Sequence, residues 1–508
     1  MFLSGSGPAS SSFNEFNPLF NRNRLALQAS GVAGSNKTFG DEIAHSAVLG
    51  RFSYSIGQFH YETDGFRENN DLTRNIFNLF LQGSITPKTS VQAEVRQTET
   101  KYGDLTLRFN PDDFFPDQRN QEKGRSVRLG FHHAFAPGSD FIGSAILQHR
   151  TVRFHDNFVV LLDDIRVDEH SEMAELQHLF RGKWLSLTIG AGRSESRQGQ
   201  TEDIEFLPPY PFTLPTIPTD SKIRQTNLYL YSQLRLPANI TATVGASADF
   251  LTSPMGDRDQ VNPKVGLTWN PVPGTTLRAA AFRVLKKELA TDQTIEPTQV
   301  AGFNQFFDDP TGTRTWNYGV AVDQKFSSAV AGGAEYSWRD LVVLTNILVD
   351  PSAGTTAIVP TDWKDRRGRA YLYWTPGDRA ALSAEYHYER LDRGIEFAPD
   401  GIVQVTTHKI PLGIGYFHPL GVIARLKATF HDQNGRFMNG SNPDGEPGSD
   451  RFWIFDASLG YRLPERWGIL SFEVKNLFDE SFRFQDTDRD NPLIQPKRTV
   501  YCKVMLAI

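Results

Sequence analysis

The most regular spacing of possible metal ligands lies near the end of the chain, in Asp486-Thr487-Asp488-Arg489-Asp490-Asn491. Carboxylates at alternate positions begin a calcium-binding loop, because Ca²⁺ takes several oxygen ligands. The segment lacks the glycine expected at the sixth position and the glutamate expected at the twelfth, where Lys497 stands. We therefore interpret Asp486, Asp488 and Asp490 as a solvated acidic loop, and we predict no bound metal and no other cofactor.

A second set of candidates is the aromatic pair in the proline-rich segment 207–220. Tyr210 and Phe212 stand between prolines there. Such a segment is stiff and extended, because proline fixes one backbone dihedral and removes a hydrogen-bond donor. It either grips a ligand between its two rings or simply covers what lies beneath it, and covering is the simpler interpretation.

Catalytic motifs are absent from the sequence. It contains no Gly-x-Ser-x-Gly, no His-Glu-x-x-His and no phosphate-binding loop with its lysine. The carboxylates are spread over polar segments, where they have no need to pair. We predict that the protein is not an enzyme.

The elements that would position these residues are β-strands that alternate between apolar and polar side chains. In the final segment Val500, Cys502 and Val504 fall on one face, and Tyr501 and Lys503 fall on the other. The mean hydropathy is −0.40, and no segment approaches the roughly 20 apolar residues of a spanning helix. A transmembrane strand needs only about 9–11 residues with one apolar face. The pattern predicts an all-β chain that forms a closed antiparallel transmembrane β-barrel.

The connections between these strands alternate between tight turns and long polar segments. Turn chemistry marks the short ones, as in Ala136-Pro137-Gly138-Ser139. Counting strand signals gives about 22 strands, in a barrel over 23–508 preceded by an N-terminal segment over 1–22. An even number places both ends of the barrel on the periplasmic side and the long loops outside. Those loops are expected near 63–73, 103–123, 153–170, 197–221, 253–259, 287–312, 347–360, 391–401, 434–448 and 480–495.

Charged residues at successive inward positions indicate a wet lumen rather than a dry core. These residues carry charges of both signs. They would therefore hydrate the wall and weakly tune its selectivity for what passes, but they do not identify a substrate. The candidates for ligand contact are Glu94, Arg96, Glu385, Arg425 and Lys427.

Composition restricts the partners. The formal net charge of −6 gives no case for nucleic acid, and the single cysteine, Cys502, excludes an intramolecular disulfide. The first residues, Met1-Phe2-Leu3 followed by a Ser/Gly/Pro run, do not form a secretory signal peptide. Since a protein of the outer membrane needs one, we expect that the natural chain has further residues upstream.

The C-terminal segment resembles a known family. Asn476-Leu477-Phe478-Asp479 after an alternating strand, and Pro496-Lys497-Arg498-Thr499 before the last one, are similar to closing motifs of TonB-dependent receptors. The resemblance implies an outer-membrane receptor that binds a scarce substrate at its outer loops and translocates it through the lumen. It also implies contact with outer-membrane lipid and lipopolysaccharide, and with a TonB-type energy-transducing complex.

The sequence departs from that family at its start, because only about 20 residues precede the first strand where the resemblance implies a plug domain of roughly 150. It also ends in Ile508 rather than in the family's usual aromatic residue. The stretch from Gly57 to Asp71 resembles barrels that follow tetratricopeptide-repeat regions. The alternative function is therefore a plugless conduit or anchor for an upstream periplasmic module. Three resolutions are open: the plug belongs to the missing upstream part, the loops fold inward, or the pore is open.

Overall fold

The computed structural model describes residues 24–158, 161–206, 212–213, 216, 218–350, 355–393, 402–439, 442–487 and 494–507. In these ranges the chain forms 25 strands and one turn of 3-10 helix, η1 (Pro464–Arg466). No helix among them is long and apolar enough to cross a bilayer.

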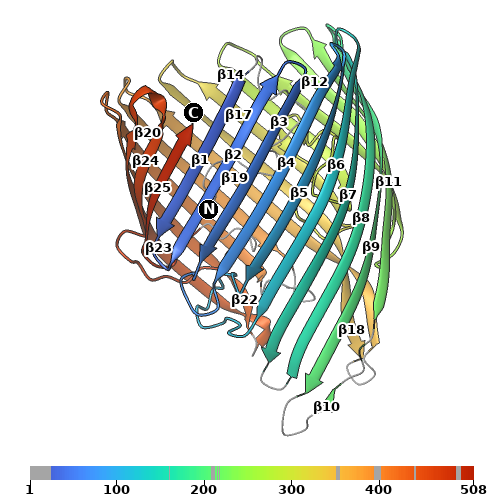
Figure 1. Ribbon diagram of the computed structural model, residues 1–508, viewed down its shortest axis with the longest axis vertical. Helices are drawn as coiled ribbons and strands as arrows, with labels where there is room; N and C mark the ends of the chain where they lie inside the picture. Colours follow the sequence, from blue (N-terminus) through green and yellow to red (C-terminus); the bar gives the residue numbers. More distant parts are fainter. Residues whose placement is uncertain are drawn as a thin grey trace.

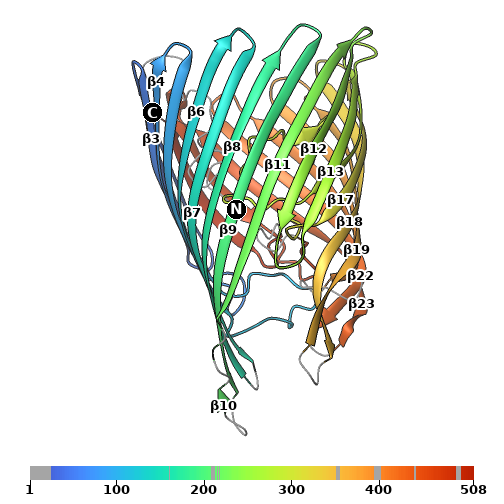
Figure 2. The ribbon, with the colours of Figure 1, turned by 90° about the vertical axis from the view of Figure 1, so that its right-hand side faces the viewer.

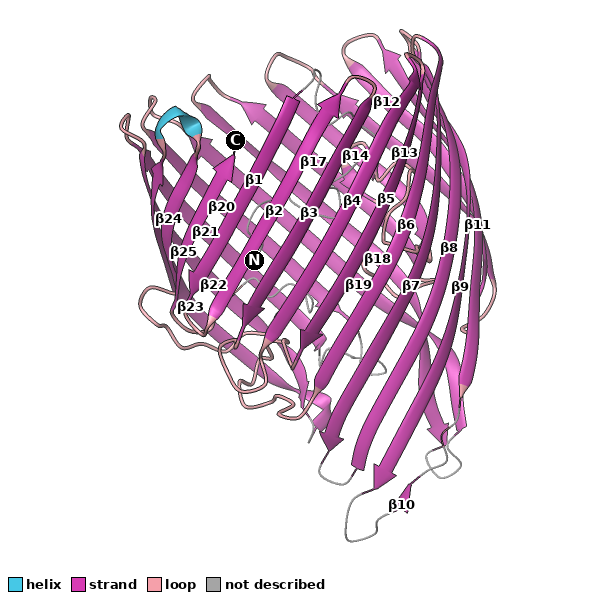
Figure 3. Ribbon diagram, viewed as in Figure 1, coloured by secondary structure: helices cyan, strands magenta, loops and turns pink. Residues whose placement is uncertain are grey.

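The strands follow one another with few interruptions (Figures 1 and 3). The first half of the chain contains β1 (Arg24–Gly34), β2 (Thr38–Leu49), β3 (Phe52–Thr63), β4 (Leu72–Thr86), β5 (Thr89–Tyr102), β6 (Arg119–Ala136), β7 (Ser139–Phe158), β8 (Leu161–Arg181), β9 (Leu185–Phe206), β10 (Phe212–Thr213), β11 (Thr219–Leu236) and β12 (Ile240–Thr252). The second half contains β13 (Arg258–Trp269), β14 (Thr275–Leu285), β15 (Gln299–Val300), β16 (Phe303–Asn304), β17 (Arg314–Lys325), β18 (Val330–Asp350), β19 (Thr355–Trp374), β20 (Ala380–Asp392), β21 (Ile402–Phe417), β22 (Val422–Asn439), β23 (Asn442–Arg462), β24 (Gly468–Lys475) and β25 (Thr499–Ala507).

The sheet closes on itself because the last strand pairs with the first. β1 and β25 run antiparallel, from Gln28 opposite Ala507 to Gly34 opposite Tyr501. Setting aside the two-residue strands β10, β15 and β16, the described chain forms a closed barrel of 22 antiparallel strands. Closure leaves no sheet edge, so every backbone donor in the wall can be paired without water. The predicted fold class and strand number are confirmed.

The two faces of the sheet are inverted relative to a water-soluble protein. On β13, Asn262 is 0% exposed and Lys264 is 1% exposed, whereas Val261 is 65% and Val265 is 55% exposed. Apolar side chains therefore cover the outside of the wall, and polar side chains point to the lumen, as the alternation predicts. In β25 the same rule exposes Cys502 on the outer face and buries Tyr501 and Thr499.

The barrel has two different ends. The turn end carries the short connections and the ends of the first and last strands, and it uses glycines with positive φ such as Gly138 (φ 78) and Gly377 (φ 86). The loop end carries the longer connections, including 64–71, 103–118, 286–313 and 476–498.

Three predicted loops prove to be largely strand, so that part of the prediction was wrong. The sheet continues through most of 153–170, 347–360 and 434–448, where β7 pairs with β8, β18 with β19, and β22 with β23 (Figure 1). Likewise β9 and β11 occupy much of 197–221. Beyond the apolar zone water wets both faces of a hairpin, so its sequence loses the alternation that marks a strand.

Three of the loop-end connections fold back into the lumen, and we call them the inner loops: 103–118, 286–313 and 476–498, the last described over 476–487 and 494–498. In Figure 2 the blue segment that follows β5 crosses the mouth of the barrel toward β22 and β23. Its Phe109 stacks on Phe437 of β22 with ring centroids 4.3 Å apart. Among the resolutions left open by the sequence, the structure shows inward-folded loops.

A cation on the outward face should destabilise the barrel. We expect Val265→Arg to lower the free energy of unfolding by about 2–4 kcal/mol, because an arginine near the bilayer midplane is costly. The measurement is urea unfolding of the chain refolded in lipid vesicles, followed by tryptophan fluorescence. Val272→Arg, in the turn between β13 and β14, is the matched control and should change stability by less than about 0.5 kcal/mol. Equal effects of the two substitutions would contradict the assignment of the lipid-facing surface.

Candidate functional site

The inner loop 286–313 is fixed to the wall by a buried ion pair. Lys287 Nζ and Glu296 Oε2 are in direct contact, and the two side chains are 5% and 1% exposed. Tyr231 of β11 donates its hydroxyl hydrogen to Glu296 Oε1 at 2.5 Å, and Asn227 Nδ2 donates to Oε2 at 3.2 Å. Both carboxylate oxygens are therefore satisfied, which a buried charge requires.

Further polar contacts extend this anchor along the wall. Lys264 of β13 donates to Gln305 Oε1 at 2.7 Å. Glu175 of β8 accepts the Thr294 hydroxyl hydrogen at 2.5 Å and the backbone N–H of Ile295 at 2.9 Å. The loop thus contacts strands that lie far from it in the sequence, and it has little freedom to swing out of the lumen.

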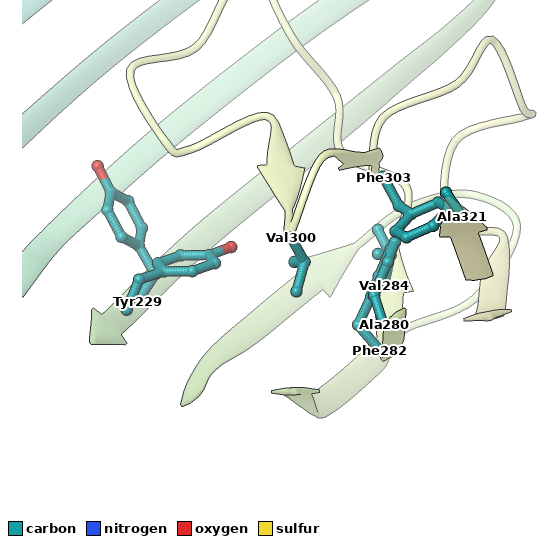
Figure 4. Packing of buried hydrophobic residues seen from close by; sticks show 8 residues of the cluster. Tyr229, Ala280, Phe282, Val284, Val300, Phe303 and Ala321 are labelled. Carbon is teal, nitrogen blue, oxygen red and sulfur yellow. The ribbon is translucent and has the colours of Figure 1, made fainter. Parts of the chain in front are cut away.

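Apolar packing also holds this loop against the wall. Val300 and Phe303, from the hairpin of β15 and β16, pack on Ala280 and Phe282 of β14 (Figure 4). The wall opposite Phe303 carries Gly319 of β17, and a Cβ atom there would collide with the Phe303 ring. Glycine is needed at that position because the ring occupies the space of a side chain.

The other two inner loops meet on the opposite wall. Phe482 of the loop 476–498 stacks on Phe452 of β23 at 4.2 Å, and Phe484 lies edge-on to His431 of β22 at 5.6 Å. The backbone N–H of Phe109 donates to Gln485 Oε1 at 3.2 Å, which joins loop 103–118 to loop 476–498.

Between these loops lies a cavity of about 1150 Å³. Its walls are the lumen faces of β17 to β22 together with the tips of loops 286–313 and 476–498. The residues that matter for its chemistry are Phe307, Asp309, Arg339, Trp363, Asp365, Arg367, Arg369, His387, Glu389, Lys409, His431, Phe484 and Asp486. This mixture of aromatic and charged groups suits a polar ligand larger than a single ion.

Three of the guanidinium groups in the cavity are already paired. Arg339 contacts Asp309 directly and Asp365 at 3.2 Å, and its guanidinium lies 3.7 Å from the centre of the Phe307 ring. Arg367 reaches Asp365 at 3.2 Å and Glu389 at 3.6 Å. Arg369 reaches Glu385 at 3.0 Å. These pairs build a rigid and nearly neutral frame.

Three other cations on the same wall make no such ion pair, although Asp456 of β23 lies directly opposite Lys427 in the sheet. Among the described residues, no carboxylate lies within ion-pair distance of Lys409 on β21 or of Lys427 and Arg425 on β22. Lys409 stands opposite His431 in the sheet, and Lys427 and Arg425 follow toward the turn end. His431 is buried, and its Nδ1 atom has no hydrogen-bond partner in the described chain. We call Lys409, Lys427 and Arg425 the cation ladder.

The candidate residues predicted from the sequence lie in different parts of the barrel. Arg425, Lys427 and Glu385 face the lumen beside the cavity or below it, as expected. Glu94 and Arg96 also face the lumen, but on β5 rather than at the cavity, and Glu94 is used structurally, since it pairs with Arg128 at 2.6 Å and accepts from Asn78 at 2.6 Å. Arg96 follows Glu94 by two residues in β5, so the two side chains lie on the same face of the sheet.

The acidic-loop and aromatic candidates are only partly described. Asp486 is buried, and its backbone N–H donates to the Leu107 carbonyl at 2.8 Å. Asp488, Asp490 and Tyr210 lie outside the described residues, as does the segment 1–22. Phe212 pairs through its backbone with Phe206 of β9. No group of three or more His, Cys, Asp or Glu side chains in the described ranges is arranged to hold a metal ion.

The residues that fix the inner loop 286–313 to the wall were not predicted from the sequence. Lys287 and Glu296 lie in a long polar segment and carry no local signal, because their partners come from β11 and β13. Burial opposes ionisation of Glu296, but the ammonium groups of Lys287 and Lys264 outweigh this cost and hold its pKa below the ordinary value.

Comparison with known proteins supports one family. Residues 50–477 match the family model described as the TonB-dependent receptor-like β-barrel. No curated protein sequence matches the chain. Among solved structures, the chain is similar to the copper transporter OprC, with TM-score 0.72 and 13% identity over 97% of this chain and 84% of that chain.

Two further structures give similar values. The ferric citrate transporter FecA in its unliganded form has TM-score 0.70 and 13% identity, over 97% of this chain and 79% of that one. The FrpB iron transporter from Neisseria meningitidis has TM-score 0.70 and 10% identity, over 96% and 82%. At these identities the likeness shows the fold alone.

Removing the Glu296 charge should release the inner loop 286–313. Glu296→Gln removes the carboxylate in direct contact with the buried Lys287, at a cost of up to about 3–5 kcal/mol, and we expect faster amide hydrogen exchange across the loop. Asp292→Asn, an exposed position in the same loop, is the control and should not change the exchange.

The pair of Lys287 and Glu296 should also make the stability of the inner loop 286–313 depend on pH. Because the folded-state pKa of Glu296 is depressed, its stabilisation is complete above the ordinary glutamate pKa and is lost as pH falls through the lower folded value. The protection of the loop amides, that is, their exchange rate relative to the intrinsic rate at the same pH, should therefore fall on acidification in the wild type and change less in Glu296→Gln. Identical pH profiles would contradict the role of the pair.

Proposed function

Because the chain belongs to the TonB-dependent receptor-like β-barrel family, we propose that it binds a small anionic ligand in the luminal cavity and passes it through the barrel. The loop end then faces the exterior and the turn end faces the periplasm. The ligand enters between the inner loops, and the cavity of about 1150 Å³ is the binding site. The assignment as an outer-membrane receptor barrel rests on the family, and the choice of ligand rests on the cavity.

The observation that carries this proposal is the cation ladder. Lys409 borders the cavity, and Lys427 and Arg425 continue along the same wall toward the turn end. An ammonium or guanidinium group that makes no ion pair attracts an anion more strongly than a paired one, since pairing cancels most of its field. His431, with its unpartnered Nδ1, offers a further polar contact next to Lys409.

The paired guanidiniums give this site its shape. Arg339, Arg367 and their carboxylates need no ligand to stay in place, so binding does not have to order them. Aromatic rings such as Phe307 and Trp363 provide flat apolar surfaces between the charges. The site therefore suits a compact anion with some apolar or aromatic surface.

The names of related structures suggest one such class. FecA is named as a ferric citrate transporter and FpvA was determined with pyoverdine–iron complexes. We extend this to the present chain as an anionic metal chelate, in which the metal is cargo held by its own ligands. Transport would be driven by a TonB-type energy-transducing complex, and the outer wall would contact outer-membrane lipid. The alternative, a conduit or anchor for an upstream periplasmic module, stays a prediction.

Ligand binding can be tested with the Fe(III)–citrate complex as the probe. We expect Lys409→Gln to weaken binding to the refolded chain about tenfold or more, because a hydrogen bond to a charged group contributes about 1.5–3 kcal/mol. Isothermal titration calorimetry measures the affinity, with free citrate as a metal-free anion. Lys88→Gln, exposed in the turn between β4 and β5 and far from the cavity, is the control of equal charge. Failure of the wild type to bind either anion, or equal binding by both variants, would overturn the anionic-ligand assignment.

Lys427 and Arg425, the two residues of the cation ladder nearer the turn end, allow an independent prediction. In a planar bilayer with a potassium chloride gradient, any current through the wild-type lumen should favour chloride. The double variant Arg425→Gln with Lys427→Gln should shift the reversal potential toward potassium, because it removes two wall charges. An unchanged reversal potential would show that ions do not pass along this wall.

A further inference from the structure

The inner loop 103–118 spans the mouth of the barrel from β5 and β6 to β22 and β23 (Figure 2), and we call it the crossbar. In the closed strand order β4, β3, β2, β1, β25 and β24 lie between β5 and β23. The crossbar reaches past all of these strands, because its Leu107 packs with Phe452 of β23 and its Phe109 packs with Phe437 of β22. It therefore ties together two distant parts of the wall.

The near end of the crossbar is locked by a buried carboxylate. Asp104 is 2% exposed, and its Oδ2 atom accepts from the Arg108 guanidinium at 2.5 Å and from the backbone N–H of Phe115 at 3.0 Å. Arg67 of the neighbouring loop 64–71 reaches the same oxygen at 3.3 Å. From that loop Asn69 also donates its side-chain amide hydrogen to the Phe115 carbonyl at 2.6 Å. The near half thus folds as one unit with loop 64–71, and its buried charge is satisfied.

The far end of the crossbar is built into the opposite wall. The backbone N–H of Phe109 donates to Gln485 Oε1 at 3.2 Å. Gln485 is in turn held by Gln433 of β22, which accepts from its backbone N–H at 2.7 Å and donates to its carbonyl at 2.9 Å. On β23 a Cβ atom at Gly448 would lie 2.4 Å from the Phe109 ring. The wall therefore leaves a side-chain space empty for this ring.

Both ends are too well anchored for the crossbar to act as a lid. Leu107 and Phe109 are 5% and 7% exposed, and the Leu107 carbonyl accepts from the backbone N–H of Asp486 at 2.8 Å. In the middle of the segment, Pro111 and Asp112 are exposed. Segments that open readily have few buried apolar contacts and few buried hydrogen bonds, which is the opposite of these two ends. The crossbar therefore stays in place while a ligand passes.

The crossbar runs where the wall of the barrel is lowest. β24, β25, β1 and β2 have 8, 9, 11 and 12 residues, whereas β22, β23, β7 and β8 have 18, 21, 20 and 21. In Figure 1 the tips of β8 and β9 extend well beyond the loop ends of β1 and β25. The crossbar bridges this low side, and the cavity lies away from it, on β17 to β22. The way to the cavity is therefore between the crossbar and the tall strands.

We propose that the crossbar is a fixed size filter at the loop end. A compact solute passes beside it to the cavity, and a bulky one, such as a folded protein, stays outside. Leu107 and Phe109 set the limit by holding the far end against the wall. Close-packed contacts of this kind yield little to pressure from a solute, so the limit is sharp. This inference goes beyond the proposed function, because it concerns the size of what enters and not its charge.

The test is the rate at which a thiol in the cavity is labelled in the refolded full chain. Cys502→Ser removes the natural thiol, and Ser337→Cys places one at the cavity. N-ethylmaleimide is the small reagent, and a maleimide attached to a rigid gold cluster is the bulky one. Mass spectrometry follows the labelled fraction. We expect rapid labelling by the small reagent and slow labelling by the bulky one.

Removal of the crossbar should raise the size limit. In the shortened variant a Gly-Ser linker replaces 105–117, which is feasible because β5 and β6 are adjacent and Tyr102 lies opposite Asn120. The bulky reagent should react at least about tenfold faster there, because labelling no longer waits for the crossbar to open. N-ethylmaleimide should react at an unchanged rate. Fast labelling of the unshortened chain by the bulky reagent, from whichever end it enters, or equal rates in the two chains, would overturn the filter.

Two pairs of substitutions test the far-end anchors without changing the length of the chain. Leu107→Ala with Phe109→Ala should also accelerate the bulky reagent. The matched pair Pro111→Ala with Asp112→Ala, in the exposed middle of the same segment, should not. Heat-modifiable migration on gels verifies that all variants are closed barrels. Equal acceleration by the two pairs would contradict the role of the wall contacts. Because the reagents need no anion site, the result is independent of whether the cavity binds Fe(III)–citrate.

Discussion

The structure depends on one constraint, the hydrogen-bonded closure of β25 onto β1. In lipid a sheet edge would leave a row of unpaired backbone groups, so the chain must return to its first strand. Closure of 22 strands encloses a wide lumen. The lumen is wet, the inward side chains are polar, and the outward ones are apolar, as Lys264 and Val265 illustrate on adjacent positions of β13.

A wet lumen in turn explains how charge is used inside the barrel. Where an inner loop lies on the wall, water is expelled and each charge needs a partner, as in the contact of Lys287 with Glu296. Lys409 at the cavity, and Lys427 and Arg425 beyond it on the same wall, make no ion pair among the described residues. The division between paired and unpaired charges separates the scaffold of the site from the groups that meet a ligand.

The sequence predicts the parts of this fold that local pattern controls. Alternation identifies the spanning strands and the lumen-facing Arg425 and Lys427, because one face of each strand meets lipid. Pattern fails at the hairpin tips near 153–170, 347–360 and 434–448, where both faces meet water. The pattern also fails to predict that the loop 286–313 folds into the lumen. That position depends on contacts such as the hydrogen bond of Glu296 with Tyr231, 65 residues away in the sequence. No local property of Lys409 distinguishes it from other strand lysines; its role comes from the cavity that the inner loops create.

The most direct test is single-channel conductance in a planar bilayer. The central claim is that the inner loop 286–313, fixed inside the lumen, narrows the barrel and frames the cavity. The refolded 508-residue chain should be compared with a variant in which 290–309 is replaced by a short Gly-Ser linker, after heat-modifiable migration shows that both are closed barrels. The account requires a several-fold larger conductance in the shortened variant. Equal conductances would mean that the loop does not occupy the path through the lumen, and would contradict it.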